Sequence, residues 1–287
     1  MEGNVNMRAR TDLAIELDEE VSGSLGVEKS ASSDGDIKVT RIRITSSEGE
    51  KTMRRRKGSY VTVEFPQLYK ITDYSGLKKM LIKELKSLLP ESPDRVLVVG
   101  LGNTDITPDA VGPLTAGKIL ATRHISGQFA DGIGLKGLKS VSVLSPGVLG
   151  QTGIESAELI KGAAQAVKPE VVIIIDSLAS RSTERLFRTV QLSDAGIAPG
   201  SGVKNSRREI NSETLGVPVI AMGVPTVMDA EALAYELTGR ETEKSSGMFV
   251  TPKEVDMLCG RISDILAAAL NVFLQPDIDE DIVAGLV

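Results

Sequence analysis

The chain has 287 residues, of which 41% are hydrophobic and 25% charged, a composition that suits a globular protein with one large core or two modest ones. The net charge of −6 argues against direct nucleic-acid binding, which usually needs a basic surface. A single cysteine excludes an internal disulfide. No apolar run reaches the roughly 18 residues of a membrane span, and the first 20 residues lack the apolar core of a signal peptide. We therefore expect a soluble intracellular protein.

The N-terminal third is expected to be irregular at first and then β-rich. Residues 1–20 are polar and predict an extended arm, and the Ser- and Gly-rich residues 22–36 predict a flexible loop. Two β-rich stretches follow, Ile37–Thr45 and Tyr60–Phe65. The basic residues 54–57 lie between them, and for these we favour a solvated turn at a hairpin tip over a ligand-binding patch.

From residue 75 onward the pattern alternates helices with buried strands. The expected helices are Ser75–Leu89, Pro108–Ala121, about 154–167, about 228–237, and Thr251–Leu274 with a capping box; the expected strands are Arg95–Gly100, Val141–Leu144, Val171–Ile175 and Val217–Met222. Near-continuous apolar strands are typical of a sheet that helices cover on both sides. The sequence therefore predicts an α/β fold with a mostly parallel or mixed sheet, helices on both faces and a small N-terminal β-rich extension.

Two of the expected strands deliver carboxylates at their carboxyl ends, where sites form in open sheets. Asp105 and Asp109 follow the strand RVLVVG, and Asp176 follows VVIII. If the strands are near neighbours, Asp109 and Asp176 converge. Two close carboxylates can divide acid and base roles in peptide hydrolysis, or they can hold a divalent metal that activates water. They can equally be structural, since an Asp after a strand often caps the next helix.

Other catalytic arrangements have little support in the sequence. His124 and Cys259 are single residues of their kind, which leaves little material for a Ser-His-Asp or Cys-His site. The turn Gly100-Leu101-Gly102-Asn103 has Asp105 where a dinucleotide-binding loop has its third glycine. A nucleotide-dependent oxidoreductase is therefore disfavoured.

Several segments in order resemble the germination proteases of spore-forming bacteria. They are RTDLAIE (10–16), GLGNTDITPDAVGP (100–113), LSPGVLGQTGIES (144–156), VVIIIDSLASRS (171–182), SDAGIAPGSGVKNSRREI (193–210) and GVPTVMDA (223–230). The resemblance implies an atypical aspartic-type endopeptidase that degrades small acid-soluble spore proteins, with Asp109 and Asp176 as its catalytic pair. It also implies a homotetrameric zymogen in the cytoplasm of the developing spore core, with no required cofactor.

The family is similar in fold to hydrogenase-maturation endopeptidases, which bind a metal near the corresponding strand turn. A divalent metal thus remains an alternative, with Asp109, Asp176 and Asp229 as its ligands. A non-catalytic protein that binds the same spore proteins is a second alternative. No nucleic acid or membrane partner is expected.

The N-terminal segment resembles the sequence that the family cleaves, Thr-Glu-Phe-Ala-Ser-Glu, cut between Glu and Phe. Thr11-Asp12-Leu13-Ala14-Ile15-Glu16 has the same layout. We therefore predict self-cleavage between Asp12 and Leu13, which makes residues 1–12 a propeptide and residues 13–287 a single α/β protease domain. Arg181, Arg185 and Asn103 are candidate substrate-binding residues, because arginine pairs well with acidic side chains.

Overall fold

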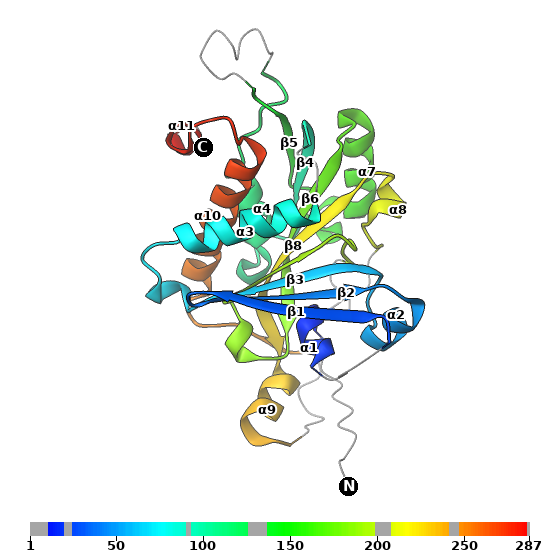
Figure 1. Cartoon of the computed structure of the whole chain (residues 1–287), viewed down its shortest axis with the longest axis vertical. Coiled ribbons are helices and arrows are strands. Elements are labelled where there is room, and N and C mark those ends of the chain that lie inside the picture. Colours follow the sequence, from blue (N-terminus) through cyan, green and yellow to red (C-terminus); the bar gives the residue numbers. More distant parts are fainter. Residues whose placement is uncertain are drawn as a thin grey trace.

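The computed structural model describes residues 11–19, 25–89, 93–125, 137–198, 208–240 and 247–285, and a mixed β-sheet runs through the middle of the molecule (Figure 1). In the described part the sheet has nine strands, ordered β1-β2-β3-β7-β8-β6-β4-β5, with β9 on β8. The strands are β1 (Val27–Asp34), β2 (Ile37–Ile44), β3 (Gly58–Glu64), β4 (Arg95–Gly100), β5 (Ser140–Leu144), β6 (Val171–Ser180), β7 (Thr189–Ser193), β8 (Val219–Asp229) and β9 (Phe249–Val250). Strands β8, β6, β4 and β5 are mutually parallel, whereas β1, β2, β3 and β7 form antiparallel pairs that continue to β8. The predicted α/β architecture is confirmed.

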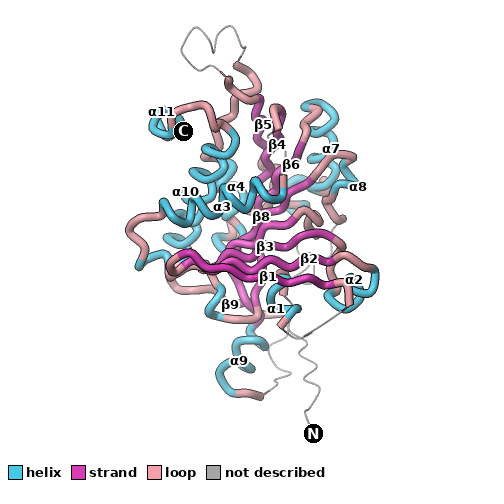
Figure 2. Tube along the Cα trace, in the orientation of Figure 1, coloured by secondary structure: helices cyan, strands magenta, loops and turns pink. Residues whose placement is uncertain are grey.

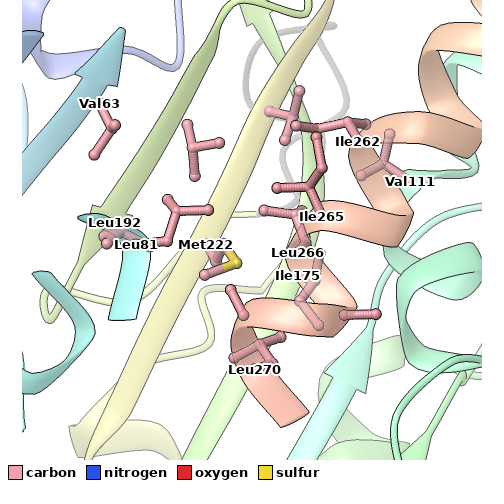
Figure 3. Close-up of a cluster of buried hydrophobic side chains, with 14 of the residues drawn as sticks. Val63, Leu81, Val111, Ile175, Leu192, Met222, Ile262, Ile265, Leu266 and Leu270 are labelled. Carbon is pink, nitrogen blue, oxygen red and sulfur yellow. The ribbon is translucent and has the colours of Figure 1, made fainter. Parts of the chain in front are cut away.

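One face of the sheet carries the main apolar core. It is covered by α3 (Ser75–Leu88), α4 (Val111–Ala116) and α10 (Val255–Leu274), whose apolar side chains form one cluster with alternate strand residues such as Ile175 and Met222. Figure 3 shows Ile262, Ile265, Leu266 and Leu270 of α10 directed toward these strand residues. Although α10 is long and apolar enough to cross a membrane, most of it is buried here, so its composition is explained by the core.

The opposite face, called the site face below, carries two smaller apolar clusters. One lies under α7 (Ser156–Val167) and α8 (Ser212–Leu215). The other lies under α1 (Ala14–Asp18), which packs on β2 and β3. The remaining elements are α2 (Ser47–Met53), α6 (Leu149–Thr152), α9 (Ala230–Thr238), α11 (Glu280–Gly285) and the 3-10 turns η1 (Leu68–Lys70), η2 (Thr107–Asp109) and η3 (Thr183–Arg185). Figure 2 shows α9 projecting away from the sheet.

The N-terminal region is more ordered than the sequence predicts. Residues 27–34 form the edge strand β1 instead of a flexible loop, because every one of them pairs with β2 across a turn at Gly35. Its side chains are almost all exposed, which is why a Ser-rich composition is tolerated there. Residues 14–18 form a helix instead of an extended arm, and four of its five residues are buried.

Three further boundaries differ from the prediction. Strand β6 continues five residues past Ile175 because the long strand β8 runs beside it, so Asp176 lies within the strand instead of after it. The expected helix from Pro108 divides into η2 and the short α4. Helix α10 begins at Val255 with Glu254 at its N-cap and no side-chain cap hydrogen bond, so Thr251 lies outside the helix and the expected capping box does not form. The Thr251 hydroxyl donates to Thr226 O.

Candidate active site

A cavity of ≈ 480 Å³ opens on the site face, and both Asp109 and Asp176 line it. The two aspartates meet because β4 and β6 are adjacent parallel strands, with Gly100 opposite Ile175. Asp176 is 6% exposed, and its Oδ1 accepts a hydrogen bond from the backbone N–H of Ser177 at 2.9 Å. The next side chain, Ser177, also lines the cavity, and its buried hydroxyl has no hydrogen-bond partner in the part of the chain that the structure describes.

The backbone that carries Asp109 is held tightly in place. Gly102 has φ +125°, and its backbone approaches Asp109 so closely that an added Cβ would lie 1.9 Å from Asp109 O. Asn103 N donates to the same carbonyl at 3.1 Å, and Thr226 Oγ1 on β8 donates to Pro108 O at 2.6 Å. Cys259 donates its thiol hydrogen bond to Thr107 O from α10. The single cysteine therefore supports the turn η2 that presents Asp109.

The segment that contains the predicted cleavage site, residues 11–19 and called the docked segment below, contributes Asp12 to the wall of this cavity. Asp12 pairs with the part of β6 that extends past the end of β4, donating from N to Ala179 O at 3.0 Å and accepting at Oδ2 from Ala179 N at 2.9 Å. Gln191 Nε2 donates to Asp12 O at 3.0 Å, and Gln191 Oε1 accepts from Ala14 N at 2.7 Å. Leu13 between them is completely buried. The Asp12–Leu13 bond is thus held on both sides.

An ion-pair cluster fixes the helix that follows this bond. Glu16 is 5% exposed, and its carboxylate accepts from Ser180 Oγ at 2.7 Å, from the backbone N–H of Arg181 at 2.9 Å and from Arg185 Nη1 at 3.3 Å. Arg185 also donates to Glu19, and its Nε lies 3.6 Å from Glu64 on β3. Burial acts to lower the pKa of Arg185, but the hydrogen bond to Glu19 and the charges of Glu16 and Glu64 outweigh it, so the net direction is upward.

The basic residues 54–57 are not a purely solvated turn, because Arg54, Arg55 and Arg56 all line the cavity. Arg55 donates from Nη2 to Thr11 O, one residue before Asp12. Tyr60 also lines the cavity and donates its hydroxyl to Arg56 O at 2.9 Å; burial raises its pKa to about 12. The turn is solvated at Arg54 and Lys57, which are exposed, but its three arginines also border the site.

Asn103 does not line this cavity; it organises the loop beside it. Its Oδ1 accepts from Asp105 N at 2.9 Å and from Gln151 Nε2 at 2.8 Å. Gln151 also donates to Asp105, so the loop after β4 is tied to α6. Of the three predicted substrate-binding residues, Arg181 contacts the docked segment through its backbone N–H and Arg185 through its guanidinium, whereas Asn103 contacts Asp105 and Gln151.

Asp229 lies at the end of β8 but does not join the two aspartates in the cavity lining. It caps α9, with Oδ1 accepting from Glu231 N at 2.8 Å. Among the described residues no group of three His, Cys, Asp or Glu side chains lies close enough to hold a metal ion. The donor set expected for a metal is therefore not assembled from Asp109, Asp176 and Asp229.

Sequence reasoning missed the residues that hold the docked segment, namely Gln191, Arg55 and Ser180. Gln191 lies within TVQLS, a short alternating stretch that gave no indication of a site. Its role depends on β7 lying two strands from β6, which no local pattern reveals.

Comparisons with known proteins identify the family of the chain. The profile of the germination protease family matches residues 5–238. The germination protease of Clostridium tetani is 40% identical, with 96% of this chain and 98% of that protein covered. The germination protease of Caldanaerobacter subterraneus subsp. tengcongensis is 42% identical, covering 94% and 95%, and that of Clostridium acetobutylicum is 37% identical, covering 94% and 96%.

Among solved structures, a [NiFe] hydrogenase maturation protease, HycI from Thermococcus kodakarensis, is similar to part of the chain. The TM-score is 0.39 and the identity 18%, with 66% of this chain and 98% of that chain covered.

Proposed function

The chain belongs to the germination protease family, and on that premise we propose that this peptidase degrades small acid-soluble spore proteins after cleaving itself between Asp12 and Leu13. The observation that carries the proposal is the placement of Asp12 in the same cavity as Asp109 and Asp176. A site that holds its own Asp–Leu bond in this way can accept a similar bond in another protein.

Asp109 and Asp176 supply the acid and base in this proposal. The ionised member of the pair takes a proton from a water molecule as the water oxygen bonds to the carbonyl carbon of Asp12. The C–N bond then breaks, and the nitrogen of Leu13 receives a proton from the protonated carboxyl. Peptide and water give a new carboxyl group and a new amino group, and the pair ends with the one proton it began with.

The contacts of Glu16 support a preference for acidic substrates. Because Glu16 stands four residues after the predicted cut, Arg185 and Ser180 would receive an acidic side chain at that position of a substrate. Glu16 stays in the chain after the cut, so a substrate would have to displace it. Glu64 on β3 lies beside Arg185 Nε, so the guanidinium keeps a charged neighbour when Glu16 is displaced. Charge-assisted hydrogen bonds of this kind are stronger than neutral ones.

The test is self-cleavage of the full-length chain, together with cleavage of a synthetic peptide that copies residues 9–19, read by mass spectrometry. Asp109→Asn and Asp176→Asn are expected to abolish cleavage at Asp12–Leu13. Asp105→Asn is the matched control, because this exposed aspartate belongs to the same loop and its backbone should keep the loop folded. Cleavage that survives either of the first two substitutions would contradict the carboxylate pair.

The same experiment, repeated with and without a chelator, tests two alternatives. A metal-dependent peptidase would lose its activity in a chelator and recover it when zinc or manganese is added. Because Asp229 does not line the cavity, the metal would then need another ligand besides Asp109 and Asp176. A non-catalytic binding protein would bind the peptide and leave it intact.

Two further statements follow from the family resemblance alone. We propose that the protein acts as a homotetramer and is located in the cytoplasm of the developing spore core. Sedimentation equilibrium of the full-length chain tests the first statement, and fluorescence microscopy of a tagged protein during sporulation tests the second.

A further inference from the structure

Gln191 lies on β7 with its side chain on the site face, where it lines the cavity and is 8% exposed. Its two hydrogen bonds identify the orientation of the amide. Asp12 O can only accept, so it faces Nε2, and the N–H of Ala14 can only donate, so it faces Oε1. Gln191 therefore forms hydrogen bonds to the residues on both sides of Leu13, and one of these bonds goes to the carbonyl oxygen of the peptide bond that is proposed to be cut.

The strand register brings Gln191 level with Asp176. Gln191 pairs with Gly223 on β8, and Gly223 pairs with Asp176 on β6, so the three residues form one row across the sheet. Residues in one row direct their side chains to the same face, and adjacent strands are about 4.8 Å apart. Gly223 between them has no side chain, and the side chain of Leu178 occupies that place. The carboxylate and the amide thus lie on the same face of the sheet, two strands apart.

The surroundings show that the sheet itself does not need this amide. Thr62 lies opposite Gln191 on β3, and Thr189 is two residues away on the same face. Both hydroxyls are buried without a hydrogen-bond partner in the described part of the chain. A purely structural glutamine would be expected to satisfy such neighbours. Gln191 instead directs both polar ends toward residues 12 and 14.

On the premise of the proposed function, we propose that Gln191 is a third catalytic residue, which stabilises the oxygen of the scissile carbonyl during attack by water. As the water oxygen bonds to the carbonyl carbon, the electron pair of the C=O bond moves to the oxygen, which becomes negatively charged beside Nε2–H. The pair returns when the C–N bond breaks. A fixed donor at that oxygen lowers the barrier because the charge exists only during the reaction. The contact from Oε1 to Ala14 N keeps this carbonyl in register.

The experiment compares Gln191→Met and Gln191→Glu with wild type in the full-length chain, by self-cleavage and by cleavage of the peptide that copies residues 9–19. Methionine keeps the volume and removes the donor. Loss of an oxyanion donor typically lowers kcat by about 100- to 1000-fold, so both variants should show a loss of this size, while KM changes by less than about tenfold. Thr189→Val is the matched control on the same strand and face. Because its hydroxyl makes no bond to lose, kcat should stay within about twofold.

Hydrogen exchange of the Ala14 amide gives a second measurement that does not require activity. In the Asp109→Asn chain this amide should be protected, and adding Gln191→Met should speed its exchange at least about tenfold. The N–H of Asp12, which is bound to Ala179 O, is the internal reference. Wild-type kcat in Gln191→Met would overturn the proposal while leaving the peptidase function intact. Absence of cleavage by wild type itself would instead overturn the proposed function, and the catalytic role of Gln191 with it.

Discussion

Replacing Gly102 by alanine should inactivate the enzyme although both aspartates are retained. An added Cβ would lie 1.9 Å from Asp109 O and 3.3 Å from Asp109 Oδ1, and Gly102 has φ +125°, a conformation that side-chain-bearing residues rarely adopt. Real Cβ contacts are essentially never under 3.0 Å, so the two backbones must separate by 3.0 − 1.9 = 1.1 Å. The displaced group is the backbone of Asp109.

The magnitude follows from that displacement. A misplacement of about 1 Å in a catalytic constellation can cost about 100-fold in rate, so kcat/KM should fall about 100-fold or more. The unfavourable φ should cost about 1–3 kcal/mol of folding stability, which a protein of this size tolerates. Activity should therefore be lost while the chain stays folded.

The assay is peptide cleavage at a temperature where circular dichroism shows the variant to be native. Gly162→Ala is the control, because Gly162 lies inside α7 with nothing within 4 Å of the added Cβ. That change should leave activity intact and raise stability by up to about 1 kcal/mol, since alanine favours the helix. Wild-type activity in Gly102→Ala would refute the reasoning that the position of Asp109 limits the rate.

Two other predictions concern the packing behind the site. Leu266 is completely buried in the face that α10 covers, so Leu266→Ala should destabilise the protein by about 2–5 kcal/mol in urea unfolding, whereas a change under about 1 kcal/mol would mean that the site collapses to fill the space. Burial, with a smaller contribution from the charge of Asp256, raises the pKa of the Cys259 thiol to about 12 from a reference of 9.0, so iodoacetamide at pH 8 should label the native chain far more slowly than the urea-unfolded chain. Equal labelling of the two states would contradict the burial of Cys259. Because the folded thiol has the higher pKa, only the unfolded thiol ionises above about pH 9, so folding stability should decline as the pH rises above that value.

The sequence by itself determined the elements that local patterns control. The apolar runs 96–100 and 171–175 form nearly all of β4 and the first half of β6, because residues buried on both faces of a sheet must be apolar. The rule that sites form at the carboxyl ends of such strands pointed to Asp105, Asp109 and Asp176, and the resemblance to the family narrowed these to Asp109 and Asp176. The structure places the latter two in the lining of one cavity.

Only the tertiary structure decided which residues that are distant in the sequence come together around the site. Strand β1 exists because β2 offers it a complete set of backbone partners, which outweighs its Ser-rich composition. Gln191 reaches Asp12 across 179 residues of chain, and Arg185 reaches Glu16 across 169. Such contacts depend on strand order and register, since shifting a strand by one residue moves each side chain to the other face. A sequence pattern specifies which residues are buried, but the partners that distant residues find depend on the assembled sheet.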